Sequence, residues 1–215
     1  IIRKPNGNVD VKVYRRTKKH NKHSLFYHRE FKYNETKEIN LYGLGSKDRF
    51  EISGNTKKSI LIRIISGKGQ DKIIDQSTVR GSKKLTRVYD KVNGVQIKGS
   101  SETKNFTSND KYLNTYNRDR FKPNKTIPLI KIGYNIDDGL FLGGGIAVKR
   151  HGWRKAPFAN IHELYGVIAV RTGSFSLSHN STFYQVAKKW NFNIRTELLA
   201  PNAVTNFYGL GNETK

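Results

Sequence analysis

The chain has 215 residues, of which 40 are Lys or Arg and 17 are Asp or Glu, so its formal net charge at pH 7 is +23. Aromatic residues make up 11% of the sequence, too many for a disordered tail, and cysteine is absent, which excludes disulfide bonds and thiolate sites. No apolar run approaches the roughly 18 residues of a membrane-spanning helix, which excludes a helical membrane protein but not a membrane β-barrel.

The sequence begins with Ile1 and contains no Met, so we interpret it as an internal fragment or a processed chain. The composition predicts three parts. Residues 1–98 are expected to form a β-rich basic domain and residues 99–127 a polar linker. Residues 128–215 are expected to form antiparallel meander strands of a β-barrel that this chain leaves incomplete.

The N-terminal part contains short β-prone runs separated by Gly, Asn, Ser and Lys. Such short runs with turn residues between them predict an all-β domain. The expected strands are residues 9–14, 25–33, 38–42, 49–52, 59–65 and 85–89. The run 60–65 is the most apolar of them, which favours a central strand.

The C-terminal part changes to longer runs with a period of two, which predicts an antiparallel meander. The expected strands are residues 140–149, 161–171, 174–184 and 186–197. In the last run one face carries Trp190, Phe192 and Ile194, while the other carries Asn191, Asn193 and Arg195.

These strands are too long, and their second faces too polar, for an ordinary soluble sandwich. In a membrane barrel, Trp190, Phe192 and Ile194 would be lipid-facing. Asn191, Asn193 and Arg195 would be lumen-facing. The sandwich remains open as the alternative.

Several segments resemble a known family. The segment 127–143 ends with Asp137-Asp138-Gly139 followed by Leu140-Phe141-Leu142-Gly143. This segment resembles the opening barrel strands of the bacterial surface-antigen family, the outer-membrane assembly-factor type of β-barrel. Segments 152–158, 200–202 and 206–214 are similar to further pieces of that pattern.

The upstream segment 41–54 is similar to a β-rich segment found in large Gram-negative outer-membrane proteins. There it joins a calcineurin-like metallophosphoesterase domain to such a barrel. The resemblance implies a periplasm-facing β domain followed by barrel strands in the outer membrane, with lipid as the main partner and other envelope proteins as further partners. No metallophosphoesterase ligand motif is present in this sequence, so no metal ligand is carried over.

Two Gly-rich segments, 44–48 and 66–75, resemble the G-x-G-x-D turns of calcium-binding β-rolls, with Asp48, Asp71 and Asp75 as weak candidate ligands. Each turn carries Lys where a cation site needs oxygen donors, so plain turns are the favoured interpretation. We expect no metal site and no cofactor.

A basic cluster could bind a polyanion through phosphate neutralisation and stacking. Its candidate residues are Arg15, Arg16, Lys18, Lys19 and Lys22. The histidines among them, His20, His23 and His28, are interpreted as part of a solvated loop rather than a zinc site. No recognition-helix or RNP-like motif supports nucleic acid as the partner.

No catalytic constellation is found, since Asp137-Asp138 is best read as a hairpin turn and no G-x-S-x-G elbow is present. The leading hypothesis is a non-enzymatic fragment of an outer-membrane β-barrel protein of the surface-antigen type. Its role would be membrane-protein insertion, transport or cell-envelope maintenance. The alternative is a soluble basic all-β module that binds nucleic acid or another polyanion.

Overall fold

The computed structural model describes residues 1–16, 23–136, 138–187 and 190–200. Strands make up 58% of the structure and helices 4%, which confirms the all-β class. The chain forms two compact units, Ile1–Arg118 and Asp119–Lys215, which we describe separately as unit 1 and unit 2. None of the described helices is long and apolar enough to cross a bilayer.

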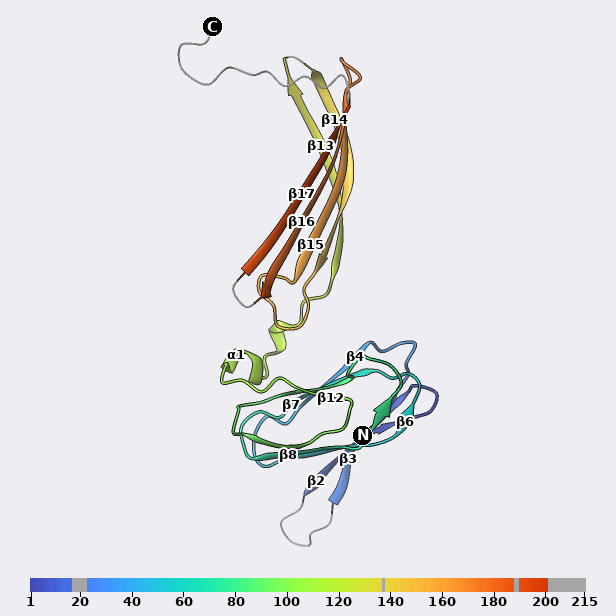
Figure 1. The fold of residues 1–215 in the computed structure, drawn as a ribbon, viewed down its shortest axis with the longest axis vertical. Helices are drawn as coiled ribbons and strands as arrows, with labels where there is room; N and C mark the ends of the chain where they lie inside the picture. The colour runs from blue at the N-terminus through green and yellow to red at the C-terminus, as the bar shows by residue number, and fades with distance from the viewer. Residues whose placement is uncertain (17–22, 137, 188–189, 201–215) are drawn as a thin grey trace. The chain divides into compact units, whose positions relative to one another are not determined.

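Unit 1 is built on parallel strands that return to the same sheet after each turn of the chain (Figure 1). The first sheet contains β4 (Glu38–Tyr42), β7 (Leu61–Ile65), β10 (Thr86–Tyr89) and β12 (Thr103–Asn105). The second contains β5 (Arg49–Ile52), β8 (Asp71–Asp75) and β11 (Val95–Lys98), and the third pairs β6 (Asn55–Thr56) with β9 (Thr78–Val79). Because the chain visits the three sheets in order, unit 1 is a three-sided parallel solenoid.

The solenoid stacks residues at a nearly constant spacing. Ile39 lies beside Ile62 and Phe50 lies beside Ile73, an offset of 23 residues in both sheets. The expected strands 38–42 and 49–52 are confirmed at their bounds. Their parallel stacking was not predicted, because the two Gly-rich turns were treated as separate motifs rather than as neighbouring turns of one repeat.

The interior of the solenoid is filled by β-branched side chains. Ile62, Ile64 and Val88 are fully buried on the first sheet, and Ile73 is fully buried on the second. Such side chains suit strands because their restricted χ1 angles pack well against a pleated surface.

One end of this core is covered by an antiparallel sheet. It consists of β1 (Ile2–Arg3), β2 (Val9–Arg16) and β3 (His23–Phe31). Val9 and Val11 of β2 belong to the same buried cluster as the solenoid isoleucines. The sheet therefore closes the apolar interior that the first turn would otherwise expose.

Arg3 lies buried at a corner of the solenoid and joins several turns of the chain. Its guanidinium donates to the hydroxyls of Ser59 at 2.7 Å, Ser77 at 3.1 Å and Thr86 at 2.9 Å. It also donates to the backbone carbonyls of Ile60 at 2.9 Å and Leu85 at 3.0 Å. Burial lowers the pKa of this guanidinium, and the charges of Asp75 and Glu102 oppose that shift.

The two carboxylates are themselves engaged within the corner. Asp75 accepts hydrogen bonds from the Ser77 hydroxyl at 2.6 Å and the Thr103 hydroxyl at 2.9 Å. Glu102 accepts from the backbone amide of Val79 at 3.0 Å. A buried network in which each member has partners stabilises one arrangement, whereas loss of one member leaves charges without compensation.

We therefore expect Arg3→Met to lower the free energy of unfolding of unit 1 by about 3 to 5 kcal/mol, because two buried carboxylates lose their cation. The matched control is Arg49→Met, since Arg49 pairs with Glu51 on the exposed surface. Its expected cost is below about 1 kcal/mol. Urea unfolding followed by circular dichroism measures both variants, and equal costs would contradict the role given to Arg3.

The segment expected to be a linker, 99–127, contains β12, the short helix α1 (Lys111–Asn114) and the 3₁₀ turn η1 (Arg118–Arg120). The Asp110 carboxylate caps α1 by accepting from the amide of Tyr112 at 2.8 Å. β12 and α1 fall within unit 1, and the strand that begins at Lys125 falls within unit 2.

Unit 2 is a single antiparallel sheet of five long strands that follow one another in chain order (Figure 1). They are β13 (Lys125–Asn135), β14 (Gly139–Arg150), β15 (Asn160–Ala169), β16 (Phe175–Ala187) and β17 (Trp190–Leu199). The four strands expected at 140–149, 161–171, 174–184 and 186–197 are thereby confirmed as a meander. Among the described residues the sheet does not close, and β13 and β17 form its edges.

Candidate membrane-facing surface

One face of the unit 2 sheet is apolar across all five strands. Residues directly opposite each other in an antiparallel pair share a face, so the registers determine its members. Phe192 lies opposite Phe183, and Leu198 opposite Leu177. The exposed members, ordered by strand, are Ile130, Ile132, Tyr134, Leu140, Leu142, Ile146, Leu164, Ile168, Phe175, Leu177, Trp190, Phe192, Ile194 and Leu198. We call this set the apolar face.

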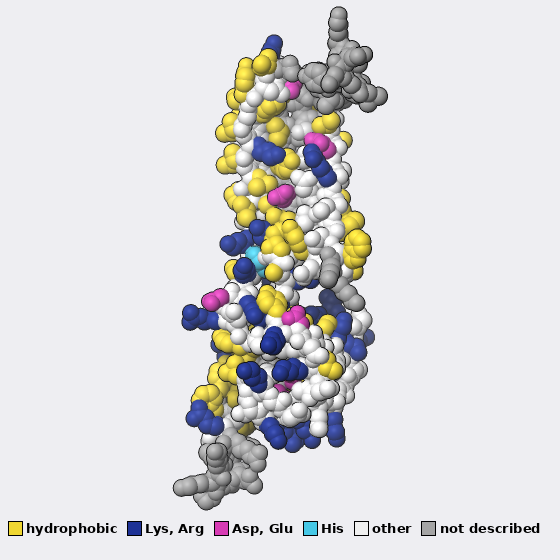
Figure 2. All heavy atoms as spheres, turned by 90° about the vertical axis from the view of Figure 1, so that its left-hand side faces the viewer, with side chains coloured by type: hydrophobic (Ala, Val, Ile, Leu, Met, Phe, Trp, Pro, Cys, Tyr) yellow, Lys and Arg dark blue, Asp and Glu magenta, His cyan; other side chains and the backbone are white. Residues whose placement is uncertain are grey.

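The apolar face is uncovered in the described structure. Ile130 keeps 81% of its side-chain surface exposed and Trp190 keeps 77%. Figure 2 shows hydrophobic side chains gathered along unit 2, while Lys and Arg side chains gather over unit 1. A contiguous apolar surface of this extent marks a surface that contacts protein or lipid, because soluble monomers rarely leave one exposed to water.

The strand lengths match the thickness of a bilayer. The strands contain 10 to 13 residues. At about 3.3 Å per residue they extend about 33 to 43 Å. A tilt of about 40° reduces this span to about 25 to 33 Å, close to the apolar band of a membrane barrel.

The opposite face carries a polar ladder that crosses four strands. The Lys131 ammonium lies 3.4 Å from the centre of the Tyr165 ring. The Ser178 hydroxyl donates to Glu197 at 3.4 Å, and Arg195 forms an ion pair with Glu197 at the same distance. We call this the polar face.

Glycines of β14 make room on the polar face. A Cβ atom at Gly145 would lie 2.2 Å from the Leu164 carbonyl oxygen and 2.5 Å from the Tyr165 Cβ. A side chain at this position would therefore displace the neighbouring strand. The close approach explains Gly143 and Gly145 inside a strand, where glycine otherwise weakens pairing. A Cβ atom at Gly144 would meet only the Leu129 carbonyl oxygen, at 3.7 Å, so this approach does not explain Gly144.

A small polar cluster interrupts the apolar face. The buried Ser181 hydroxyl lies 2.7 Å from His162 Nδ1 and 2.8 Å from His179 Nε2. A hydroxyl can donate to one imidazole and accept from the other, so the three groups satisfy one another. No sequence pattern connects His162 with His179, because the pairing of β15 with β16 that joins them is a matter of register.

The alternation expected in the last strand is present. Trp190, Phe192 and Ile194 lie on the apolar face, and Asn193 and Arg195 lie on the opposite face with Asn191. The separation of the two sets therefore agrees with the sequence. Which of them meets lipid remains a prediction.

Of the predicted polyanion-binding residues, Arg15 and Arg16 belong to β2, which pairs with β3. The Arg15 guanidinium lies over the Phe26 ring at 4.5 Å, and Arg29 lies over Phe31 at 4.9 Å. Phe26 is 65% exposed. Lys18, Lys19 and Lys22 lie outside the described residues, as does the side chain of Arg16, which ends β2.

The weak calcium candidates are divided between two environments. Asp75 uses both carboxylate oxygens in the corner that holds Arg3. Asp48 and Asp71 lie on neighbouring turns, where the amide of Asp48 donates to Asp71 Oδ1 at 2.8 Å. Within the described ranges no group of three or more His, Asp or Glu residues is arranged to hold a metal ion.

Asp48 and Asp71 nevertheless have perturbed acidities. Burial raises the pKa of Asp48, and the neighbouring charge of Asp71 raises it further. Burial also raises the pKa of Asp71, with a further contribution from Asp90. One oxygen of each carboxylate, Oδ2, is buried without a hydrogen-bond partner. The two ionised carboxylates therefore lower the stability of unit 1 at neutral pH.

We expect Asp48→Asn to raise the free energy of unfolding at pH 7, because it removes one of two neighbouring buried charges. A carboxyl group with a raised native pKa binds its proton more tightly when folded, so the wild type gains stability as the pH falls toward that pKa. The advantage of Asp48→Asn should therefore shrink on acidification. Urea unfolding between pH 7 and pH 4 tests this, with the exposed Glu35→Gln as control, and an advantage that grows on acidification would contradict it.

No protein-family model, curated protein or solved structure matches the chain. The resemblance to surface-antigen barrels therefore stays an expectation from the sequence motifs. Of those motifs, residues 201–202 and 206–214 lie outside the described residues.

Proposed function

We propose that unit 2 supplies transmembrane strands of an outer-membrane β-barrel and that unit 1 is a basic periplasmic domain preceding them. The observation that carries this proposal is the uncovered apolar face on strands of bilayer length, backed by a polar face. In a membrane barrel the first would meet lipid and the second would line the lumen. The proposed role is non-enzymatic, in membrane-protein insertion, transport or envelope maintenance.

The free edges of the sheet support this proposal. A bilayer leaves no water to satisfy unpaired backbone groups, so spanning strands must pair on both sides. Closure of a membrane barrel needs about eight strands. We therefore propose that the outer edges of β13 and β17 pair with further strands when the sheet is in the membrane.

The charge of the chain fits a location beside an anionic bilayer. The net charge of +23 attracts phosphorylated headgroups, and this attraction weakens with salt. Lipid is thus the principal partner that we propose, and other envelope proteins are further partners through the sheet edges.

A matched pair of substitutions in β17 tests the orientation. Phe192→Arg should destabilise the membrane-inserted form by about 2 to 4 kcal/mol if the residue lies near the bilayer midplane, because a guanidinium then enters hydrocarbon. Asn193→Arg places the same group on the polar face and should cost much less. The measurement is reversible unfolding of the full-length protein from lipid vesicles. Equal costs, or a larger cost for Asn193→Arg, would show that the apolar face does not meet lipid.

The second candidate function is a soluble basic module that binds nucleic acid or another polyanion. The observation that favours it is the stacking of Arg15 on Phe26 and of Arg29 on Phe31 along an exposed hairpin. Such pairs combine a phosphate-binding cation with an aromatic ring that could accept a base. No base-reading helix accompanies them in the described residues, which limits this candidate to sequence-independent binding.

Behaviour in detergent distinguishes the two functions. If the apolar face meets lipid, the purified chain should be monodisperse only in detergent and should aggregate when detergent is removed. Size-exclusion chromatography with and without detergent measures this. A monodisperse chain in plain buffer that retards a 20-nucleotide single strand would favour the soluble module instead.

A further inference from the structure

Unit 1 contains a cavity that neither proposed function uses. It has a volume of about 500 Å³ and opens beside the first parallel sheet. Its walls come from the ends of β4 and β7, the turns that follow β7 and β10, and α1 with the residues after it. All of these elements lie within unit 1, so the cavity depends on one folded body.

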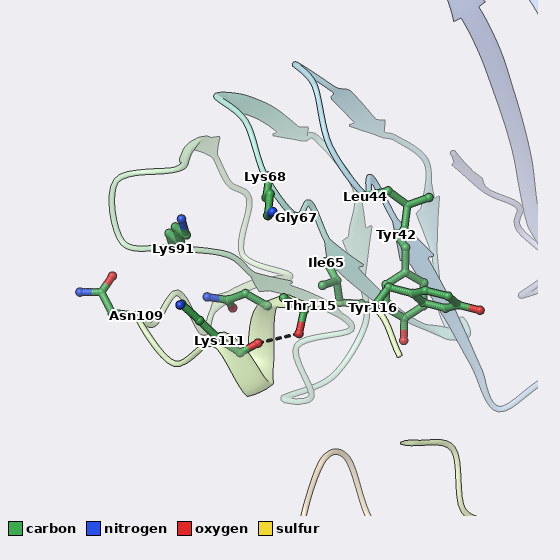
Figure 3. A pocket seen from close by; sticks show the side chains of 11 residues that line it. Tyr42, Leu44, Ile65, Gly67, Lys68, Lys91, Asn109, Lys111, Thr115 and Tyr116 are labelled. Carbon is green, nitrogen blue, oxygen red and sulfur yellow. Dashed lines mark hydrogen bonds between the residues drawn. The ribbon is translucent and has the colours of Figure 1, made fainter. Parts of the chain in front are cut away.

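One end of the cavity is aromatic and apolar (Figure 3). The rings of Tyr42 and Tyr116 meet edge to face, with centres 4.8 Å apart and an angle of 70° between their planes. Leu44 and Ile65 continue this wall. An edge-to-face pair offers a single ring face to a ligand rather than two parallel faces between which a base could lie.

The other end of the cavity is cationic. Lys68, Lys91 and Lys111 reach it from three separate elements, and Figure 3 shows them on the side away from the tyrosines. Among the described residues no carboxylate lies within 4.0 Å of their ammonium groups. Three ammonium groups at one end of the cavity favour a phosphate, because each can donate a hydrogen bond to it and contribute positive charge.

The cavity lining also includes a buried amide. Asn114 is 4% exposed, and its Nδ2 group donates to the Ser108 carbonyl. Its Oδ1 atom is buried and has no hydrogen-bond partner. An unsatisfied buried acceptor costs about 1 to 3 kcal/mol. It therefore favours a ligand that brings a hydroxyl or amide donor.

We propose that this cavity binds a phosphorylated sugar. The lysines hold the phosphate, the Asn114 carbonyl accepts from a ring hydroxyl, and the apolar face of the pyranose packs on Tyr116 beside Leu44. The single aromatic face favours a sugar over a nucleotide base. This inference is independent of the membrane proposal, because every residue it uses belongs to unit 1.

The test is isothermal titration of the full chain in detergent micelles with glucose 6-phosphate, glucose and inorganic phosphate. We expect glucose 6-phosphate to bind at least about tenfold more tightly than glucose or inorganic phosphate, because only the phosphosugar contacts both ends of the cavity. Equal affinity for inorganic phosphate would overturn the proposal, since it would reflect anion binding by surface lysines alone. Absence of saturable binding of glucose 6-phosphate would also overturn it.

Substitutions assign the binding to the cavity. The double variant Lys68→Gln/Lys91→Gln should weaken glucose 6-phosphate about tenfold or more, because charged hydrogen bonds to the phosphate are lost. The control Lys57→Gln/Lys98→Gln removes the same charge from exposed positions outside the cavity lining and should leave the affinity unchanged. Equal losses in the two double variants would overturn the assignment.

A second variant tests the contact with the sugar independently of the contact with the phosphate. Tyr116 is 53% exposed, so Tyr116→Leu should fold and should weaken glucose 6-phosphate without changing the affinity for phosphate. A parallel titration with micelles that contain a phosphorylated glucosamine glycolipid identifies the source of the sugar. Tighter binding of the glycolipid, lost in Lys68→Gln/Lys91→Gln, indicates a lipid headgroup, and equal binding indicates a free phosphosugar.

Discussion

The alternation of side chains along five paired strands is the constraint on which unit 2 depends. Each residue points opposite to its neighbour, and antiparallel register aligns these directions across the sheet. One face is therefore mostly apolar, interrupted by the His162–Ser181–His179 cluster, and the other carries most of the polar side chains. The polar groups can satisfy one another, as Lys131, Tyr165 and Glu197 illustrate. The apolar side chains cannot do so, and they need a partner phase. A bilayer would supply such a phase without further protein, and the strand length is compatible with it under the proposed function.

The solenoid of unit 1 has short strands in parallel sheets, so its strands are connected differently from those of unit 2. A hairpin cannot join two parallel neighbours, so the chain passes through another sheet before it returns to the first. The apolar interior is then a column of stacked isoleucines and valines. At the corner where Arg3 lies, backbone carbonyls and hydroxyls face inward and would be unsatisfied in an apolar core. A single guanidinium has enough donors to join them, which links four segments of the chain through one side chain.

The two units thus present different surfaces to their surroundings. Unit 2 offers apolar area to lipid under the proposed function, while unit 1 offers positive charge, exposed aromatic side chains and an amphipathic cavity. The cavity combines tyrosines from distant parts of the chain with lysines from consecutive turns of the solenoid. A repeat places equivalent turns above one another, so a lysine in each of two successive turns becomes one cationic wall. This architecture accounts for the lysine-lined cavity without any local sequence motif.

Sequence alone determined the features that depend on neighbouring residues. The period-two runs predicted four of the five strands of unit 2, their order and the separation of Phe192 from Asn193, because alternation is a local property of extended backbone. Short β-prone runs likewise located β4 and β5. Only the tertiary structure showed the parallel solenoid, the corner around Arg3, the His162–Ser181–His179 cluster and the cavity beside the first parallel sheet. Each of them joins residues many positions apart, and the register that aligns them is decided by packing over the whole unit rather than by any local pattern.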